Sequence, residues 1–154
     1  MEVAFKILLG SGMILLNLGI QIWAAGRVLR FIVHRIEDGR KGLDMGVLRM
    51  IMLFLFLGHI VQFSTWAILF MALGEFGDFE TALYHSTVNF TSLGYGDIVM
   101  SEQWRLLGAF EAANGVLMFG LTTGLVLSAL AGVLKRNPEF EQLVEQSDSK
   151  RDAS

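Results

Sequence analysis

The stretch TSLGYGD, at residues 91–97, has a composition suited to chemistry done by the backbone rather than by side chains. Glycine readily adopts backbone angles that other residues avoid, so Gly94 and Gly96 allow successive carbonyls to turn toward one axis. A ring of such carbonyls can replace the water shell of a cation. This replacement matters because moving a bare ion into a low-dielectric interior costs on the order of 20 kcal/mol. The stretch therefore predicts a site that handles cations through its carbonyl oxygens.

Other kinds of reactive site are missing from the sequence. The chain has no cysteine, which excludes disulfides and thiolate metal sites. Its histidines, at positions 34, 59 and 85, do not have the spacing of a zinc motif. Neither a catalytic triad nor a phosphate-binding loop is visible. We therefore predict no enzymatic activity, no cofactor other than bound ions, and no nucleic-acid partner.

The segments that must position this stretch are strongly apolar. Of the 154 residues, 53% are hydrophobic and 18% are charged, which is less charge than a soluble domain usually carries. Three apolar runs, at residues 7–33, 51–73 and 106–134, are each long enough to cross a bilayer, which takes about 20 residues. A further element at 81–91 is too short to cross alone. The sequence therefore predicts an all-α membrane protein with three spans.

The order of these runs suggests how the chain is divided. Backbone outside a helix is tolerated at membrane depth only where it is buried in protein or lines a wet cavity, so residues 92–96 are expected to line a pore. We expect four parts: an N-terminal transmembrane helix at 1–36, a basic cytoplasmic loop at 37–50, a pore-forming module at 51–136 and a polar cytoplasmic tail at 137–154.

Charge placement predicts the orientation of the chain in the cell's inner or plasma membrane. The connection between the first two spans holds six basic residues: Arg27, Arg30, Arg35, Arg40, Lys41 and Arg49. Residues 74–103 hold none, and they carry five acids. The positive-inside rule then puts the N-terminus outside and the C-terminus in the cytoplasm. The alternative is that the first span is a signal peptide cut near residues 24–26, although its first residues have no net positive charge.

Residues 82–97, ALYHSTVNFTSLGYGD, resemble the pore helix and selectivity filter of potassium channels. The likeness covers about residues 47–136, and the first span is an addition to the family's two-helix module. It implies an outer helix, a re-entrant pore helix, a filter and an inner helix, here at 51–73, 80–91, 92–96 and 104–135. It also implies a homotetramer in which K⁺ is bound by Ser92, Leu93, Gly94 and Tyr95, with Thr91 and Gly96 completing the filter. The family's usual filter reads T-V-G-Y-G, so Ser92 and Leu93 are departures from it.

The same likeness implies side chains that support the filter. Tyr84 would donate a hydrogen bond to Asp97, and His85 or Asn89 would reach the Tyr95 hydroxyl. The alternative is plain packing of a buried helix face. The family's pore-helix glutamate, which often pairs with the filter aspartate, is Val88 here. A histidine at position 85 also predicts that the filter responds to pH.

The third span carries polar and small residues whose roles stay open. Glu111 and Asn114 lie three apart on one helix face, and intramembrane acids usually have a role. Glu111 either faces the pore cavity or is buried behind the pore helix, bonded to its backbone or to His85. Gly115 falls near the family's inner-helix hinge. Gly120 and Gly124 allow close helix contact or widen the cavity, unless they reflect the ordinary glycine content of membrane helices.

Two further polar pairs, Asn17 with Gln21 and His59 with Gln62, are each expected to face a neighbouring helix.

Taken together, the sequence predicts passive K⁺ conduction through a tetrameric pore in contact with membrane lipids. The alternatives are a weakly selective cation channel and a non-conducting subunit that assembles with other membrane proteins.

Overall fold

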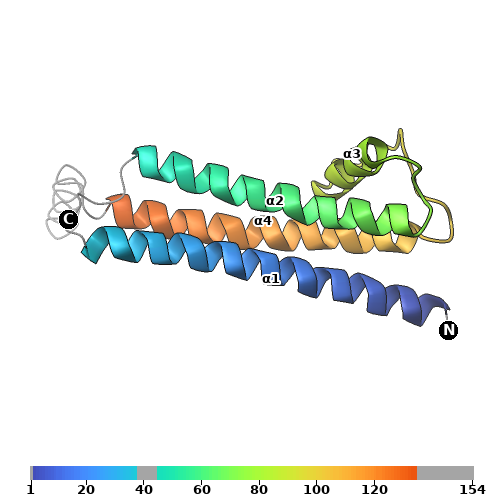
Figure 1. The fold of residues 1–154 in the computed structure, drawn as a ribbon, viewed down its shortest axis with the longest axis horizontal. Helices are drawn as coiled ribbons and strands as arrows, with labels where there is room; N and C mark the ends of the chain where they lie inside the picture. The colour runs from blue at the N-terminus through green and yellow to red at the C-terminus, as the bar shows by residue number, and fades with distance from the viewer. Residues whose placement is uncertain (1, 38–44, 135–154) are drawn as a thin grey trace, which may run out of the picture.

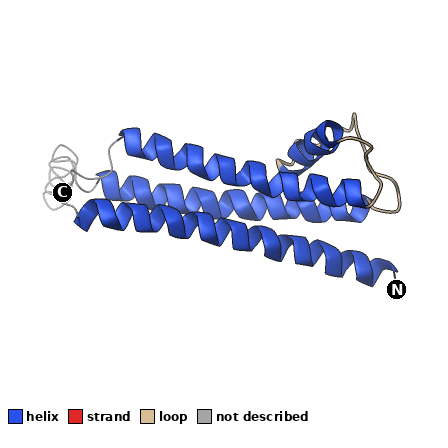
Figure 2. Cartoon of the chain, in the orientation of Figure 1, coloured by secondary structure: helices blue, strands red, loops and turns tan. Residues whose placement is uncertain are grey.

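A computed structural model describes residues 2–37 and 45–134 of the chain (Figure 1). It contains four helices in these ranges: α1 (Glu2–Glu37), α2 (Met45–Ala72), α3 (Phe79–Phe90) and α4 (Arg105–Leu134). No strand occurs in the described ranges (Figure 2). Three of the helices are long and apolar enough to cross a membrane. The predicted fold class is therefore confirmed: one additional helix precedes two membrane-crossing helices that flank a short one.

The three long helices lie side by side, and α3 is set obliquely against α2 at the end where α1 begins (Figure 1). At 1.5 Å per residue, helices of 36, 28 and 30 residues are roughly 54, 42 and 45 Å long. All three exceed the roughly 30 Å of bilayer hydrocarbon. Their ends therefore extend beyond the hydrocarbon, where polar side chains are readily solvated.

Both of the first two helices extend beyond the predicted apolar runs. The first turn of α1 contains Glu2 and its last turn contains His34 and Arg35, and both placements suit the helix dipole. The start of α2 at Met45 is six residues earlier than expected, because Val47 and Leu48 bury apolar surface there. Part of the predicted basic loop is therefore helical. Residues 38–44 of that loop, and the predicted tail, lie outside the described residues.

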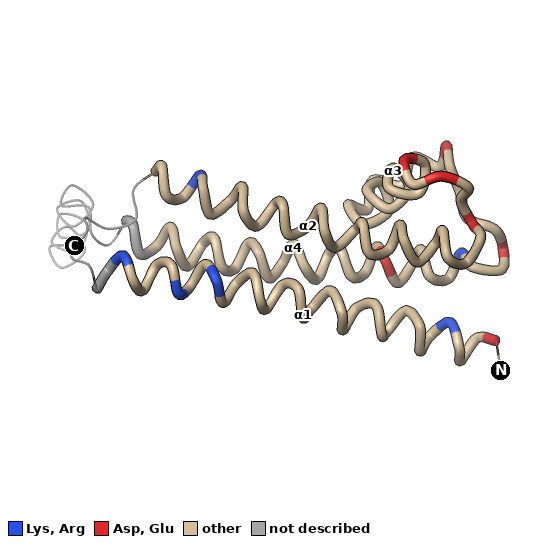
Figure 3. The backbone as a smooth tube through the Cα atoms, viewed as in Figure 1, with Lys and Arg blue, Asp and Glu red and all other residues tan. Residues whose placement is uncertain are grey.

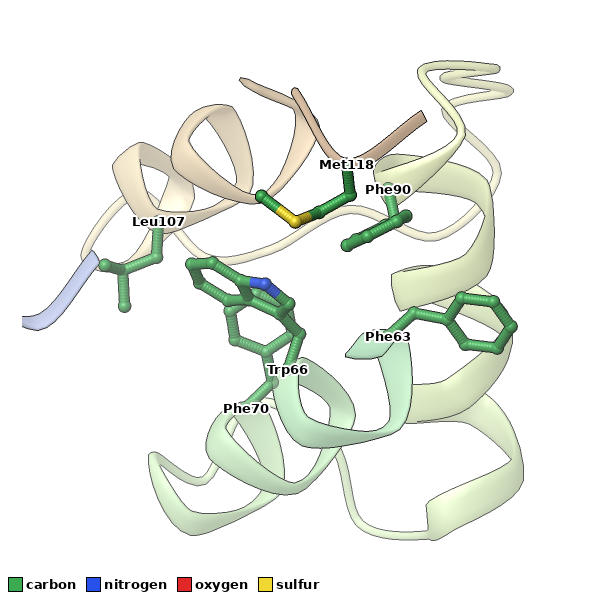
Figure 4. Packing of buried hydrophobic residues seen from close by; sticks show 6 residues of the cluster. All are labelled: Phe63, Trp66, Phe70, Phe90, Leu107 and Met118. Carbon is green, nitrogen blue, oxygen red and sulfur yellow. The ribbon is translucent and has the colours of Figure 1, made fainter. Parts of the chain in front are cut away.

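A cluster of large side chains holds α3 between α2 and α4 (Figure 4). Phe63, Trp66 and Phe70 come from α2, Phe90 comes from the end of α3, and Leu107 and Met118 come from α4. The Trp66 and Phe70 rings, both fully buried, lie 5.7 Å apart between centroids. Since lipid tails are as apolar as these side chains, the cluster stabilises the helices through close packing rather than through exclusion of water.

A closed ring of hydrogen bonds joins the three long helices next to this cluster. His59 Nδ1 lies 2.8 Å from Gln62 Oε1, and Gln62 Nε2 donates to Gln21 Oε1 at 3.0 Å. Gln21 Nε2 donates to Thr122 Oγ1 at 2.8 Å, and that hydroxyl lies 3.0 Å from His59 Nε2. Every donor meets an acceptor when the imidazole carries its proton on Nδ1 and the threonine hydroxyl donates to Nε2.

This ring confirms that the polar pairs of the first two spans face neighbouring helices. Gln62 also donates to the backbone carbonyl of Asn17 at 3.2 Å, which adds a second point of attachment to α1. Because Thr122 belongs to α4, the ring fixes α1 and α2 to the helix that follows the TSLGYGD segment. We refer to His59, Gln62, Gln21 and Thr122 as the polar ring.

Candidate functional site

The segment TSLGYGD is positioned by α3, whose start is set by a side-chain cap. The Asp78 carboxylate accepts a hydrogen bond from the Thr81 backbone N–H at 2.8 Å, as expected of an N-cap residue. This bond lowers the pKa of Asp78, because the backbone N–H stabilises the ionised form. Glu80 adds a second acid to the first turn. The positive end of the helix dipole is therefore neutralised where α3 faces the loop, and its negative end points toward residues 92–96.

The end of α3 is a Schellman motif centred on Ser92. The Leu93 N–H donates to the Val88 carbonyl at 3.0 Å, and the Ser92 N–H donates to the Asn89 carbonyl at 2.9 Å. Ser92 has φ of 60°, a left-handed conformation in which non-glycine residues are uncommon. The end of α2 uses the same motif with a glycine, Gly74, at φ of 78°. Residues 92–96 thus leave α3 in a direction fixed by two backbone hydrogen bonds.

Beyond Ser92, the backbone alternates in handedness. Gly94 has φ of 60° and Gly96 has φ of 76°, whereas Leu93 and Tyr95 are not in the positive-φ region. Residues 92–97 are all exposed in a single chain, and Tyr95 is 68% exposed. Within the described residues, none of the carbonyl oxygens of residues 92–96 accepts a hydrogen bond. We refer to residues 92–96 as the filter segment.

One side-chain contact connects the residue directly after the filter segment to α3. The Tyr84 hydroxyl donates to the Asp97 carboxylate at 2.7 Å, so the predicted hydrogen bond is present. This bond raises the pKa of Tyr84 and lowers the pKa of Asp97, because it stabilises the neutral phenol beside an ionised carboxylate. Asp97 is therefore held in place without the family's pore-helix glutamate.

A second contact at this end was not predicted. The Ser101 backbone N–H and hydroxyl donate to the two oxygens of the Glu75 carboxylate, at 2.7 and 2.6 Å. This pair connects the loop after the filter segment to the loop between α2 and α3. The two residues are 26 positions apart, and nothing in their local sequence indicates that they pair. The only feature of the sequence that pointed to a carboxylate contact here was the acid-rich composition of residues 74–103.

The opposite side of α3 packs closely against α4 at a glycine. A Cβ atom on Gly115 would lie 1.8 Å from the Phe90 carbonyl oxygen, so only glycine fits there. The Asn89 amide donates both to the Gly108 carbonyl and to Glu111 Oε2, each at 2.9 Å. Glu111 is fully buried, which agrees with the position behind the pore helix, although its partner is Asn89 rather than the helix backbone or His85.

Two of the expected hydrogen bonds are absent from the single chain. Asn89 uses its amide nitrogen on α4, and in the described residues no hydrogen bond joins Tyr95 to Asn89 or to His85. His85 is instead buried between aromatic rings, 5.6 Å from Phe70 and 4.9 Å from Phe76 between centroids. For both residues, this geometry favours the packing alternative within one chain.

A cavity of about 410 Å³ lies behind the filter segment. Its lining includes Val88, His85, Gly94 and Gly96, so the position of the family's glutamate opens onto it. On α4, Asn114 is buried and neither its side-chain nitrogen nor its oxygen has a partner in the described residues. Gly120 and Gly124 face open space in a single chain and make no close helix contact there.

Two membrane-crossing helices, a short helix between them and an exposed segment of free carbonyls together define the pore module of an ion channel. Residues 48–131, more than half of the chain, match the family model described as "Ion channel". The protein therefore belongs to this ion channel family. No curated protein and no solved structure shows significant similarity to the chain. The matched region begins inside α2, so α1 lies outside it.

Proposed function

We propose that this ion channel conducts potassium selectively and passively through a homotetrameric pore. Four filter segments, one from each chain, surround the axis. Their backbone carbonyls bind dehydrated K⁺ ions at Ser92, Leu93, Gly94 and Tyr95, and Thr91 and Gly96 complete the filter. The buried residues Glu111, Asn114 and Gly115 support it from α4.

The free carbonyls of the filter segment carry this proposal. The five oxygens of residues 92–96 lack hydrogen-bond donors within the described chain. A backbone carbonyl without a partner costs several kcal/mol in a membrane interior, so these oxygens require partners from elsewhere. A cation stripped of its water has the complementary requirement. The alternating positive φ angles at Ser92, Gly94 and Gly96 support carbonyls that line one axis.

Exposure of the filter segment supports a tetramer. One chain leaves Leu93 58% and Tyr95 68% exposed, so a single chain cannot surround an ion. One short helix and one filter segment per chain require four copies to close the ring. The C-terminal ends of four α3 helices then point at the pore, where their partial negative charges stabilise a cation.

The distribution of charge supports an orientation for each chain (Figure 3). Among the described residues, the basic side chains of the last part of α1 and the start of α2 lie at the end of the bundle remote from α3, and most acidic side chains lie around α3. By the positive-inside rule, the arginine-rich end faces the cytoplasm and the filter segment faces the outside. The N-terminus is then outside, and α4 ends in the cytoplasm.

The direct test is potassium flux from liposomes that contain the purified full-length protein. We expect K⁺ efflux that barium blocks, because barium has nearly the size of K⁺ and a higher charge. The matched control replaces Gly94 with alanine, which is strained at φ of 60°. Intact folding of this variant is checked by its retention of the tetramer on native mass spectrometry. Wild-type liposomes with no K⁺ efflux would favour a non-conducting subunit, and a purely monomeric protein would refute the tetramer.

A weakly selective cation channel is the second candidate, and the surroundings of Val88 favour it. This residue opens onto the cavity behind the filter segment, where the family has a glutamate that braces the filter aspartate. A filter with less support behind it can adjust its carbonyls to ions of different size. Reversal potentials under mixed potassium and sodium separate the two candidates.

A further inference from the structure

A groove between α1 and α2, remote from the filter segment, has an apolar lining that includes one cationic side chain, Arg27. One cavity of about 480 Å³ is lined by residues that include Gly19, Trp23, Phe54 and Val61. A second cavity of about 230 Å³ is lined by residues that include Arg27 and Met50. Phe54 lines both cavities, so they are adjacent along the α1–α2 interface, and we refer to the two together as the groove.

The base of this groove is packed and its rim is open. Ala24, Val28 and Ile51 form part of a buried cluster beneath it, each less than 5% exposed. The Trp23 and Phe54 rings lie 6.4 Å apart and are 58% and 36% exposed. Rigid aromatic walls above a packed base give the groove a fixed shape that an apolar chain can fill.

The groove is about as long as the hydrocarbon of one bilayer leaflet is thick. Along α2, its lining runs from Met50 to Val61, roughly 16 Å at 1.5 Å per residue. Half of a hydrocarbon core of about 30 Å is about 15 Å. Along α1, residues 7–26 carry no charge and span roughly 30 Å, so Lys6 and Arg27 mark the two faces of the hydrocarbon. The cation therefore lies at the depth of lipid headgroups.

Within the described residues, the charge at that depth has an aromatic neighbour but no acidic partner. The Arg27 guanidinium lies 5.7 Å from the Trp23 ring centroid, and no carboxylate forms an ion pair with it in the described chain. Arg30 is three residues after Arg27 on α1, and Arg49 directly precedes the lining residue Met50 on α2, so both add positive potential near Arg27. Their Nε atoms bond backbone carbonyls of their own helices, at Gly26 and Met45.

We infer that this groove binds an anionic phospholipid from the leaflet at the arginine-rich end. One acyl chain lies along the groove between α1 and α2, and the phosphate contacts Arg27. The site depends on α1, which lies outside the region matched by the ion channel family, and it is independent of the ion selectivity proposed above.

Native mass spectrometry of the full-length protein in detergent tests this site with palmitoyl-oleoyl phosphatidylglycerol and phosphatidylcholine. We expect retention of up to one phosphatidylglycerol per chain and weaker retention of phosphatidylcholine. Arg27→Gln should weaken binding of phosphatidylglycerol about fivefold, the effect of one cation at a lipid phosphate. Arg30→Gln is the matched control, because it removes the same charge from the same helix outside the groove lining, and it should weaken binding clearly less than Arg27→Gln does.

A steric variant tests the acyl-chain part of the groove. Gly19→Leu adds a side chain where the glycine has open space, and it should reduce retention of both lipids. Gly12→Leu also meets open space, outside the groove, and should change nothing. The inference is overturned if Arg27→Gln and Arg30→Gln weaken binding equally, or if phosphatidylcholine is retained as well as phosphatidylglycerol. It is also overturned if Gly19→Leu dissociates the oligomer but leaves lipid retention unchanged, since the groove would then be a contact between subunits.

Discussion

Individual side chains hold the filter segment mainly at its C-terminal end. Tyr84 makes a hydrogen bond to Asp97, and Glu75 binds the loop that follows. The Tyr84 contact was predictable because both residues stand at family positions. The Glu75 contact to Ser101 was not, because it depends on how two loops meet in space. The left-handed backbone of Ser92 was also not predictable from the sequence. It arises because α3 ends at Phe90, which places Ser92 directly after the C-cap residue.

Replacing Tyr84 with phenylalanine should make conduction more sensitive to acid. The hydrogen bond lowers the pKa of Asp97, so its contribution is present above the usual pKa of about 3.9 and is lost as pH falls through the lowered value. In Tyr84→Phe the pKa of Asp97 rises toward its usual value, and the loss begins at higher pH. Potassium flux between pH 7 and 3.5, in a His85→Phe background, measures this shift. Asp97→Asn is the control that removes the titrating group, and an unshifted midpoint in Tyr84→Phe would contradict the role of the bond.

His85 should confer a pH response only below its usual pKa of 6.5. Burial lowers the pKa of His85, although Glu75 and Asp97 partly offset this effect. The neutral ring packs between Phe70 and Phe76, and its Nδ1 has no partner in the described residues. As pH falls below 6.5, the unfolded state takes up the proton more readily than the folded state, so the packed arrangement loses stability. We expect flux that is flat from pH 8 to 6.5 and declines below.

The control for this response is His85→Phe, which keeps an aromatic ring and cannot be protonated. Its flux should lack the decline that begins below pH 6.5. A decline of equal size in His85→Phe, or a step between pH 7 and 8 in the wild type, would show that another group is responsible.

At the scale of helices, the hydrophobic runs were enough to predict the three long helices, and the short helix was predicted between the last two of them. Their ends were less predictable, because α2 begins at Met45 only where Val47 and Leu48 can pack. The sequence also predicted that polar residues of the first two spans face neighbouring helices. Closure of the polar ring through Thr122 was not foreseen, since it requires three helices at one depth.

Gly115→Ala should separate α3 from α4. The new Cβ would lie 1.8 Å from the Phe90 carbonyl oxygen, and backbone cannot yield as a flexible side chain does. Overpacking of a close contact typically costs about 1–3 kcal/mol. Thermal stability of the purified full-length protein measures this loss. Gly120→Ala is the control, because that position has open space within the chain. Equal stability of Gly115→Ala and the wild type would rule out the close approach of the two helices.

The polar ring should show energetic coupling between α1 and α4. Gln21→Leu and Thr122→Val each remove one member of the 2.8 Å hydrogen bond that joins these helices. Membrane hydrogen bonds average about 0.6 kcal/mol in double-mutant cycles, with a maximum near 1.7 kcal/mol. A cycle on unfolding free energy should give a coupling in this range. The pair Asn17→Ala and Ser128→Ala, whose side chains share no hydrogen bond, should give additive effects.

For the whole molecule, the fold places a pore module beside an additional helix that fastens to it at mid-depth. The class of protein was predicted from the resemblance of residues 82–97 to a pore helix and filter, and it agrees with the family match over residues 48–131. The contribution of α1 could not be predicted, because its contacts depend on Gln21 meeting side chains 41 and 101 positions away. In the proposed tetramer, selectivity also depends on four chains acting together.

The reversal potential of the reconstituted full-length channel, with potassium on one side of the bilayer and sodium on the other, tests this account most directly. If four filter segments coordinate dehydrated K⁺ through their carbonyls, potassium should be preferred at least about tenfold, a difference of about 1.4 kcal/mol. The reversal potential should then lie far toward the potassium equilibrium value. A reversal potential near zero, from a tetramer that conducts both ions equally, would contradict potassium selectivity.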